Sequence, residues 1–126
     1  LEAFVAAMVA MERVLAGGDD VAGLDRSLRR MDDFRTFLQA TGFVIDLLCA
    51  RIVCDVAAGK LGRAAKALGS FRSLAPGDSG PSQYLLRYVD EAADAIGAGL
   101  EAGEVADLEA AGAGFDRNGM IDLIVG

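Results

Sequence analysis

Histidine is absent from this chain of 126 residues, and its absence excludes most enzyme chemistry. Histidine is the commonest general base, activates serine and cysteine nucleophiles, and is a ligand in most protein zinc sites. No other pairing of a nucleophile with a base appears along the sequence. We therefore expect a non-enzymatic protein with no catalytic residues, no cofactor and no metal site.

Proline and aromatic residues are scarce, and this scarcity favours helices. The two prolines stand at positions 76 and 81, so nearly all of the chain is free to be helical. Hydrophobic residues make up 53% of the sequence, but much of this is alanine, and aromatics are only 6%. Because small side chains let helix backbones approach closely, the composition predicts an all-α fold of closely packed helices.

Long uninterrupted apolar runs are missing as well. The longest, residues 43–58, is interrupted by three charged residues, so no segment is predicted to span a membrane. Cys49 and Cys54 lie in this run and, at about 100° of rotation per residue, point in different directions and cannot form a disulfide. Free, buried and unreactive thiols are typical of a reducing compartment, which predicts a cytoplasmic location.

The net charge of −7 is spread unevenly along the chain. Residues 1–77 carry nine acidic and ten basic side chains, whereas residues 78–126 carry ten acidic and two basic ones. An acidic C-terminal third repels phosphate backbones, so we expect no direct binding of nucleic acid. A small basic cluster consists of Arg26, Arg29, Arg30 and Arg35. Acidic residues stand among them, and we interpret the cluster as an ordinary solvated helix face.

Apolar residues recur at spacings of three and four over six segments, which predicts about six helices. The segments are 1–15, 21–38, 43–58, 61–75, 84 or 85 to 100, and a short one that carries Val105 and Leu108. The breaks between them are Gly17-Gly18, Thr41-Gly42, Gly59–Gly62, the loop 76–82 and Gly103. The run 43–58 is apolar nearly all round, so we expect this helix to be buried on most sides.

The helices are predicted to pair as three antiparallel hairpins. The hairpins span about 1–40, 43–76 and 82–112. Their elbows carry Gly17, Gly59 and Gly103, which are 42 and 44 residues apart. Such a near-constant spacing is typical of a stacked helical repeat array. We expect a repeat domain over 1–112 and then a glycine-broken apolar tail over 113–126, which is either a last short element or the start of the next one.

Residues 50–76 resemble the tetratricopeptide family. That family's spacing of glycine, alanine, large apolar residue and proline is reproduced by Gly59, Ala64, Leu68 and Pro76. The early glycine and the aromatic of the family's first helix are absent, and the repeat is longer than the family's length of about 34 residues. The resemblance implies three hairpins stacked as a right-handed array.

Longer repeats of this kind resemble the sensor domains of large LuxR-type bacterial transcriptional activators. The segment LLRYVDEAADAI, 85–96, is similar to a segment near the end of such domains. Small type III secretion chaperones with three such hairpins are a second resemblance. The chain begins inside an amphipathic pattern, without an initiator methionine, as expected of a fragment. The first resemblance implies a protein- or peptide-binding module, involved in transcription regulation, within a larger bacterial protein; the second implies a chaperone.

By the tetratricopeptide resemblance, the first helix of each hairpin would present the binding surface. The candidate binding residues are Phe4, Met8, Met11, Asp46, Cys49, Val53 and Val56. This face is apolar, and its methionines add the adaptability of peptide-binding grooves. The alternative is that these residues are simply core.

Two further non-enzymatic functions stay open on the sequence. A self-associating domain would form a homodimer by burying the segment MIDLIV, 120–125, against a second copy. A small-molecule sensor would enclose a pocket between hairpins and be stabilised by its ligand.

Three short motifs only partly match known sites. Gly59-Lys60 lacks the hydroxyl residue and the preceding strand of a phosphate-binding loop, so we interpret it as a helix elbow. The acidic segment 90–94 is similar to the magnesium box of prenyl-diphosphate enzymes but has no second box, and a solvated face is predicted. Residues 114–125 overlay a calcium loop without its first carboxylate and its last glutamate, which predicts only a similar turn.

Overall fold

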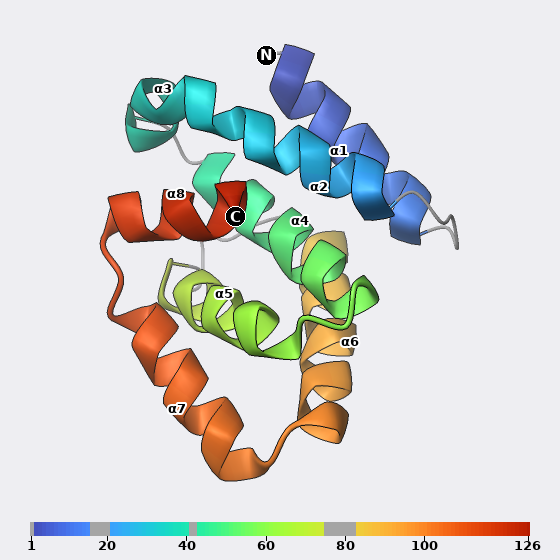
Figure 1. The fold of residues 1–126 in the computed structure, drawn as a ribbon, viewed down its shortest axis with the longest axis vertical. Helices are drawn as coiled ribbons and strands as arrows, with labels where there is room; N and C mark the ends of the chain where they lie inside the picture. Colours follow the sequence, from blue (N-terminus) through green and yellow to red (C-terminus); the bar gives the residue numbers. More distant parts are fainter. Residues whose placement is uncertain (1, 16–20, 41–42, 75–82) are drawn as a thin grey trace.

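The structure, a computed structural model, describes residues 2–15, 21–40, 43–74 and 83–126; within these ranges the side chains of 2–4, 7, 12, 14–15 and 83–85 are not described. The elements are α1 (Glu2–Leu15), α2 (Val21–Arg29), the 3₁₀ helix η1 (Arg30–Phe34), α3 (Arg35–Ala40), α4 (Phe43–Ala57), α5 (Leu61–Leu74), α6 (Gln83–Gly99), α7 (Ala102–Ala113) and α8 (Arg117–Val125). Figure 1 shows their arrangement. All described elements are helical, so the predicted all-α class is confirmed.

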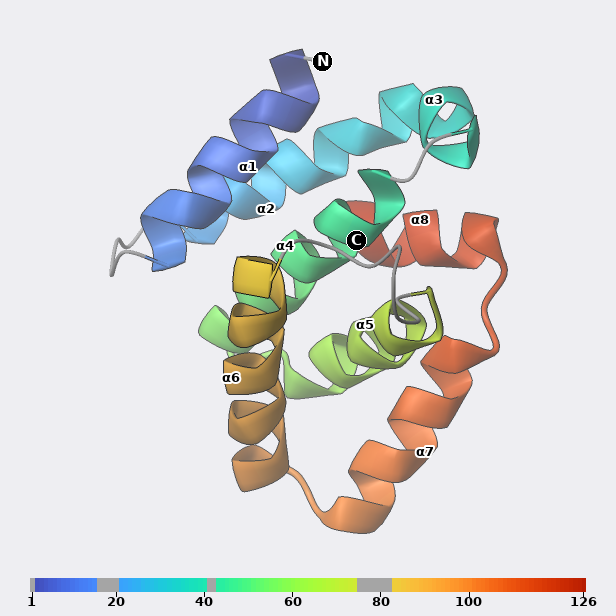
Figure 2. The ribbon, with the colours of Figure 1, turned by 180° about the vertical axis from the view of Figure 1, so that it is seen from behind.

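Helix α4 lies at the centre of the molecule. Val44 and every residue from Leu47 to Asp55 are buried. Helices α1, α2, α5, α6 and α8 all pack against α4, as Figures 1 and 2 show from opposite sides. A helix with neighbours on all sides needs apolar residues all round, which explains the continuous run in its sequence. The prediction that this helix is buried on most sides is confirmed.

Helices α4 and α5 form the predicted middle hairpin, with an elbow at Gly59. Gly59 has a φ of +78°, a left-handed conformation that favours glycine because it has no side chain. The backbone N–H of Lys60 donates to the carbonyl of Asp55 over 2.7 Å, which closes the end of α4. The interpretation of Gly59-Lys60 as a helix elbow is confirmed.

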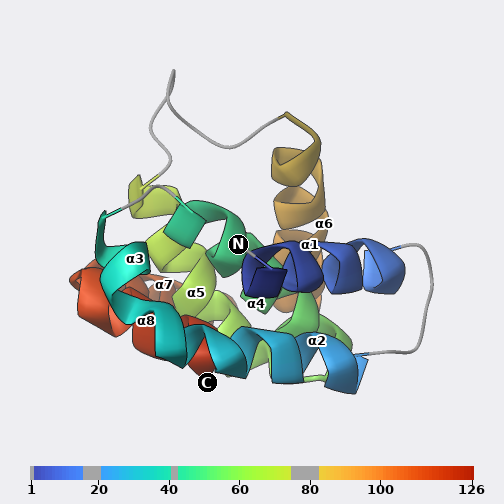
Figure 3. The same ribbon diagram turned by 90° about the horizontal axis from the view of Figure 1, so that it is seen from above.

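Helix α1 packs beside the continuous run α2–η1–α3, and both contact α4 (Figure 3). This pair corresponds to the predicted first hairpin. The breaks that separate the first helices, at 17–18 and 41–42, lie outside the described residues, as do Pro76 and the loop 76–82.

The predicted third hairpin, 82–112, does not form as a packed pair. Helices α6 and α7 meet at their short connection and then diverge, with α5 between them (Figure 1). Helix α7 packs along α5, where the backbones nearly touch at two glycines. A Cβ on Gly69 would lie 2.0 Å from the carbonyl oxygen of Glu109, and one on Gly112 would lie 1.8 Å from that of Lys66. This close approach draws α7 to α5, so a stacked array of three hairpins is not confirmed.

The predicted tail, 113–126, contains helix α8 and belongs to the core. The carboxylate of Asp116 caps the helix by accepting a hydrogen bond from the N–H of Gly119 over 2.8 Å. Met120, Ile121 and Ile124 are buried and join the same apolar cluster as α4. The segment therefore packs as a short helix, and the residues of the calcium-loop overlay form the N-cap and the body of α8.

Over the described ranges, every helix is either too short or too polar to cross a membrane.

Candidate functional site

Of the seven candidate binding residues taken from the tetratricopeptide resemblance, three are buried in the core. Met11 and Cys49 are completely buried, and the exposed fraction of Val53 is 7%. Met8, Asp46 and Val56 are half-buried, and the side chain of Phe4 lies outside the described part of the structure. Helices α1 and α4, which carry these residues, pack against each other. Met11, Cys49 and Val53 are core residues, which is the alternative given above for the candidate binding residues.

The two cysteines are buried and do not form a disulfide with each other, as the sequence predicts. Burial raises the pKa of the Cys49 thiol to about 12, and the negative charge of Asp46 adds to this rise. Burial also raises the pKa of Cys54 above its ordinary value. Thiolate is the reactive form of cysteine, so both side chains are poor nucleophiles near neutral pH.

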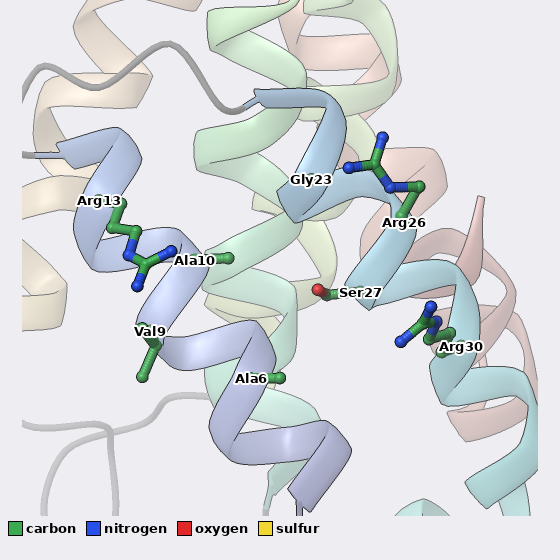
Figure 4. A pocket seen from close by; sticks show the side chains of 8 residues that line it. All are labelled: Ala6, Val9, Ala10, Arg13, Gly23, Arg26, Ser27 and Arg30. Atoms are coloured by element: carbon green, nitrogen blue, oxygen red, sulfur yellow. The ribbon is translucent and has the colours of Figure 1, made fainter.

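An open groove between α1 and α2 is the feature that most resembles a binding site. It has a volume of about 420 Å³. Its lining residues, which we call the arginine groove, are Ala6, Val9, Ala10 and Arg13 on the α1 side and Gly23, Arg26, Ser27 and Arg30 on the α2 side. In Figure 4, Ala6 and Ala10 point toward α2, the hydroxyl of Ser27 points toward α1, and the arginines lie at the rims.

The groove follows from the same residue spacing on both helices. Its members stand at positions i, i+3, i+4 and i+7 of each helix, which is one helical face. Four small residues form the floor, so the two backbones approach without filling the space above them. Val9 has an exposed fraction of 41%, and Val5, one turn before it, has 53%. The α1 rim therefore adds an exposed apolar strip to the arginines.

The three groove arginines differ from others in having no ion pair within the part of the chain that the structure describes. Of the predicted basic cluster, Arg29 is paired with Asp25 over 2.8 Å, and Arg35 is paired with Asp32 and Asp122. Arg26 and Arg30 instead share the groove with an arginine of α1. None of the described residues that line this groove is acidic, so their combined charge is positive although the chain as a whole is negative.

A second polar cluster lies in the core around Arg51, which has an exposed fraction of only 1%. Its Nε and Nη2 atoms donate to the carbonyl oxygen of Ile124, over 2.9 and 2.7 Å. Its Nη1 atom donates to Asp25 over 2.7 Å and to Asp55 over 3.2 Å. We call Arg51, Asp25, Asp55 and the Ile124 carbonyl the buried network. It joins α2, α4 and α8.

The two carboxylates of the buried network have opposite pKa shifts. Burial raises the pKa of Asp25, but hydrogen bonds and charge from Arg29 and Arg51 outweigh burial and lower the pKa from 3.8 to about 2. Burial raises the pKa of Asp55, which the charges of Arg51 and Arg63 offset only in part. One oxygen of Asp55 has no hydrogen bond and lies 3.6 Å from Nε of Arg63. The network is thus largely paired within the fold.

A larger depression, about 570 Å³, lies beside α8. It is lined by Arg63, Phe115, Gly119, Asp122, Leu123 and Gly126. Its charges are already balanced, because Asp122 pairs with Arg35 and Arg63 lies beside Asp55. It therefore offers a ligand less uncompensated charge than the arginine groove does.

The sequence showed Arg26 and Arg30 as part of a basic cluster, which we interpreted as a solvated helix face and not as a groove. The four-residue pattern on each helix was readable, since small and basic residues share one face of 6–13 and of 23–30. Pairing the two faces required the packing of α1 on α2. Within the described ranges, no three Asp, Glu, Cys or His residues gather closely enough to hold a metal ion.

Comparisons of the chain with protein-family models, with curated proteins and with solved structures found no match. The groove and its charges are therefore the basis for a functional proposal.

Proposed function

We propose that this chain is a non-enzymatic binding module whose partner is a protein or peptide segment rich in acidic residues. The observation that carries the proposal is the set of arginines Arg13, Arg26 and Arg30 around one groove, which form no ion pair with any residue that the structure describes. Arginine forms bidentate hydrogen bonds with carboxylates, and a charged groove raises the local concentration of an oppositely charged partner.

The exposed valines of α1 favour a peptide over a free ion. Val5 and Val9 continue the rim of the groove toward the start of α1, at spacings of four residues before Arg13. A peptide that alternates acidic and apolar residues would contact both the valines and the arginines. Such a segment matches the surface in both charge and apolar character.

The tetratricopeptide-like spacing of residues 50–76 supports a binding role in a larger bacterial regulatory protein. The buried, unreactive thiols support a cytoplasmic location. Self-association through residues 120–125 has less support, because Met120, Ile121 and Ile124 are already buried within their own chain.

The test is a fluorescence anisotropy titration of the full chain with the labelled peptide EELSEEL and with the neutral control QQLSQQL. We expect the acidic peptide to bind more tightly, with an affinity that falls as salt rises from about 0.05 to 0.5 M. The variant Arg26→Gln/Arg30→Gln should lose roughly tenfold or more in affinity, since it removes two charge-assisted contacts.

The matched control is Arg72→Gln/Arg87→Gln, which removes the same charge from exposed arginines outside the groove. This control should bind the acidic peptide like the unmodified chain. Equal affinity for both peptides, or equal losses in the two double variants, would show that the groove is not the binding site.

A further inference from the structure

We infer that the arginine groove binds a phosphoryl group carried by a side chain of the partner peptide. This inference rests on the proposed function and specifies the group that the groove recognises. It concerns Arg13, Arg26, Arg30 and the hydroxyl of Ser27.

The number and type of the charges favour a phosphoryl group over a carboxylate. One carboxylate carries a single charge and accepts one bidentate pair from one guanidinium. A phosphorylated side chain carries a charge of about −1.5 to −2 and has three strong acceptor oxygens. All cations of the groove are arginine and none is lysine, and the planar guanidinium is the side chain whose donor geometry matches phosphate oxygens.

The uncharged residues of the groove lining also favour a phosphoryl group over a carboxylate. The Ser27 hydroxyl points across the groove toward α1 and can donate to a further oxygen. No carboxylate is among the described residues that line the groove, so none of these side chains repels a doubly charged group. The neighbouring arginines of the basic cluster, Arg29 and Arg35, are held by aspartates and do not line it.

The dimensions of the groove suit one compact group. Ala6 and Arg13 are seven residues apart, which is about 10 Å along a helix. This length is shorter than the interface that a docked helix uses, and the volume of about 420 Å³ lies at the small end of ligand pockets. The apolar strip of Val5 and Val9 then contacts the residues that flank the phosphorylated side chain.

The experiment compares three labelled peptides that differ at one position, with Ser, Glu or phosphoserine at the fourth residue of EELSEEL. At about pH 7.5 we expect the phosphopeptide to bind at least tenfold more tightly than the Glu peptide. The variant Arg26→Lys/Arg30→Lys keeps the charge but loses the bidentate donors. It should lose most of the preference for phosphoserine while it retains salt-dependent binding of the Glu peptide.

A pH series gives a second readout. The second ionisation of a phosphoserine has a pKa of about 6, so the preference should fall as the pH is lowered from about 7.5 to 5. The chain contains no histidine, the side chain that would itself titrate in this range. The pH dependence therefore reports the ligand's own charge.

The outcomes separate this inference from the proposed function. If the Glu peptide and the phosphopeptide bind equally, the phosphoryl inference is wrong and the acidic-peptide proposal stands. If none of the peptides binds, both are wrong. If inorganic phosphate displaces the phosphopeptide at concentrations near the peptide's own dissociation constant, the groove is a site for free phosphate. The inference that a peptide side chain carries the phosphoryl group is then wrong.

Discussion

The two faces of α2 place arginines in opposite surroundings. On one face, Asp25 and Arg29 turn toward the buried network, in which Arg51 has four donor contacts to acceptors on α2, α4 and α8. On the other face, Arg26 and Arg30 line the arginine groove and form no ion pair with a described residue. An arginine that is surrounded by acceptors of the chain therefore stabilises the fold, whereas an arginine without such acceptors is available to a ligand.

The difference arises from burial and not from residue type. A buried guanidinium must be compensated within the chain, because removing it from water costs several kcal/mol. An exposed one keeps its hydration and can exchange it for a partner's oxygens at low cost. Substitutions in the buried network should thus change stability, and substitutions in the groove should change binding.

The largest effect is expected for Arg51→Met. The substitution removes the hydrogen bond from Arg51 to the buried carboxylate of Asp55 and both hydrogen bonds to the Ile124 carbonyl. This should lower the free energy of unfolding by about 3–5 kcal/mol. Urea unfolding monitored by circular dichroism measures this. The double variant Arg51→Met/Asp55→Leu should recover a large part of the loss, since no stranded charge remains. A loss under about 1 kcal/mol for the single variant would contradict a structural role for the network.

A smaller, pH-dependent effect is expected from Asp25. Its pKa is lowered from 3.8 to about 2 in the folded state, so its contribution to stability is present above the higher value and is lost as the pH falls through the lower one. Asp25→Asn should therefore destabilise the chain near neutral pH, and the difference from the unmodified chain should vanish toward pH 2. Burial raises the pKa of Asp55, so protonation of Asp55 at acidic pH favours the folded state. This effect on stability is opposite to that of Asp25.

Unfolding of Asp25→Asn and the unmodified chain at several acidic pH values measures the Asp25 contribution by difference. A difference that stays constant across this range would show that Asp25 is not held ionised by Arg29 and Arg51.

The smallest effect on stability is expected in the groove. Arg26→Gln/Arg30→Gln removes no ion pair that the structure describes and should change the free energy of unfolding by no more than about 0.5 kcal/mol. It should nevertheless weaken binding of the acidic peptide. A destabilisation as large as that of Arg51→Met would mean that these arginines are part of the fold and would remove the contrast between the two faces.

Sequence patterns predicted the local structure well. The apolar run 43–58 predicted a helix buried on most sides, and Gly59 predicted the elbow that ends it, because both depend on neighbouring residues alone. The divergence of α6 and α7 was not predictable in this way. It depends on the close backbone approach of Gly69 to Glu109 and of Gly112 to Lys66, two pairs that are far apart in the sequence and meet only when α5 and α7 pack.

The candidate site shows the same limit. Arg26 and Arg30 were visible as basic residues on one helix face, but the groove needs Arg13 from another helix. The buried network could be anticipated in part, since Arg51 and Asp55 stand one turn apart within an apolar run. Its other members, Asp25 and the Ile124 carbonyl, come from distant segments.

The contrast between the buried Arg51 and the groove arginines is tested most directly by NMR of the arginine side chains. The Nε–H signals of the full chain are recorded with and without the phosphoserine peptide. Arg51 donates its Nε–H to the buried Ile124 carbonyl, so it should give a sharp, protected signal that the peptide does not change. The signals of Arg13, Arg26 and Arg30 should be broadened by exchange in the free chain and become protected when the peptide binds. A peptide that binds without changing these three signals would contradict the account.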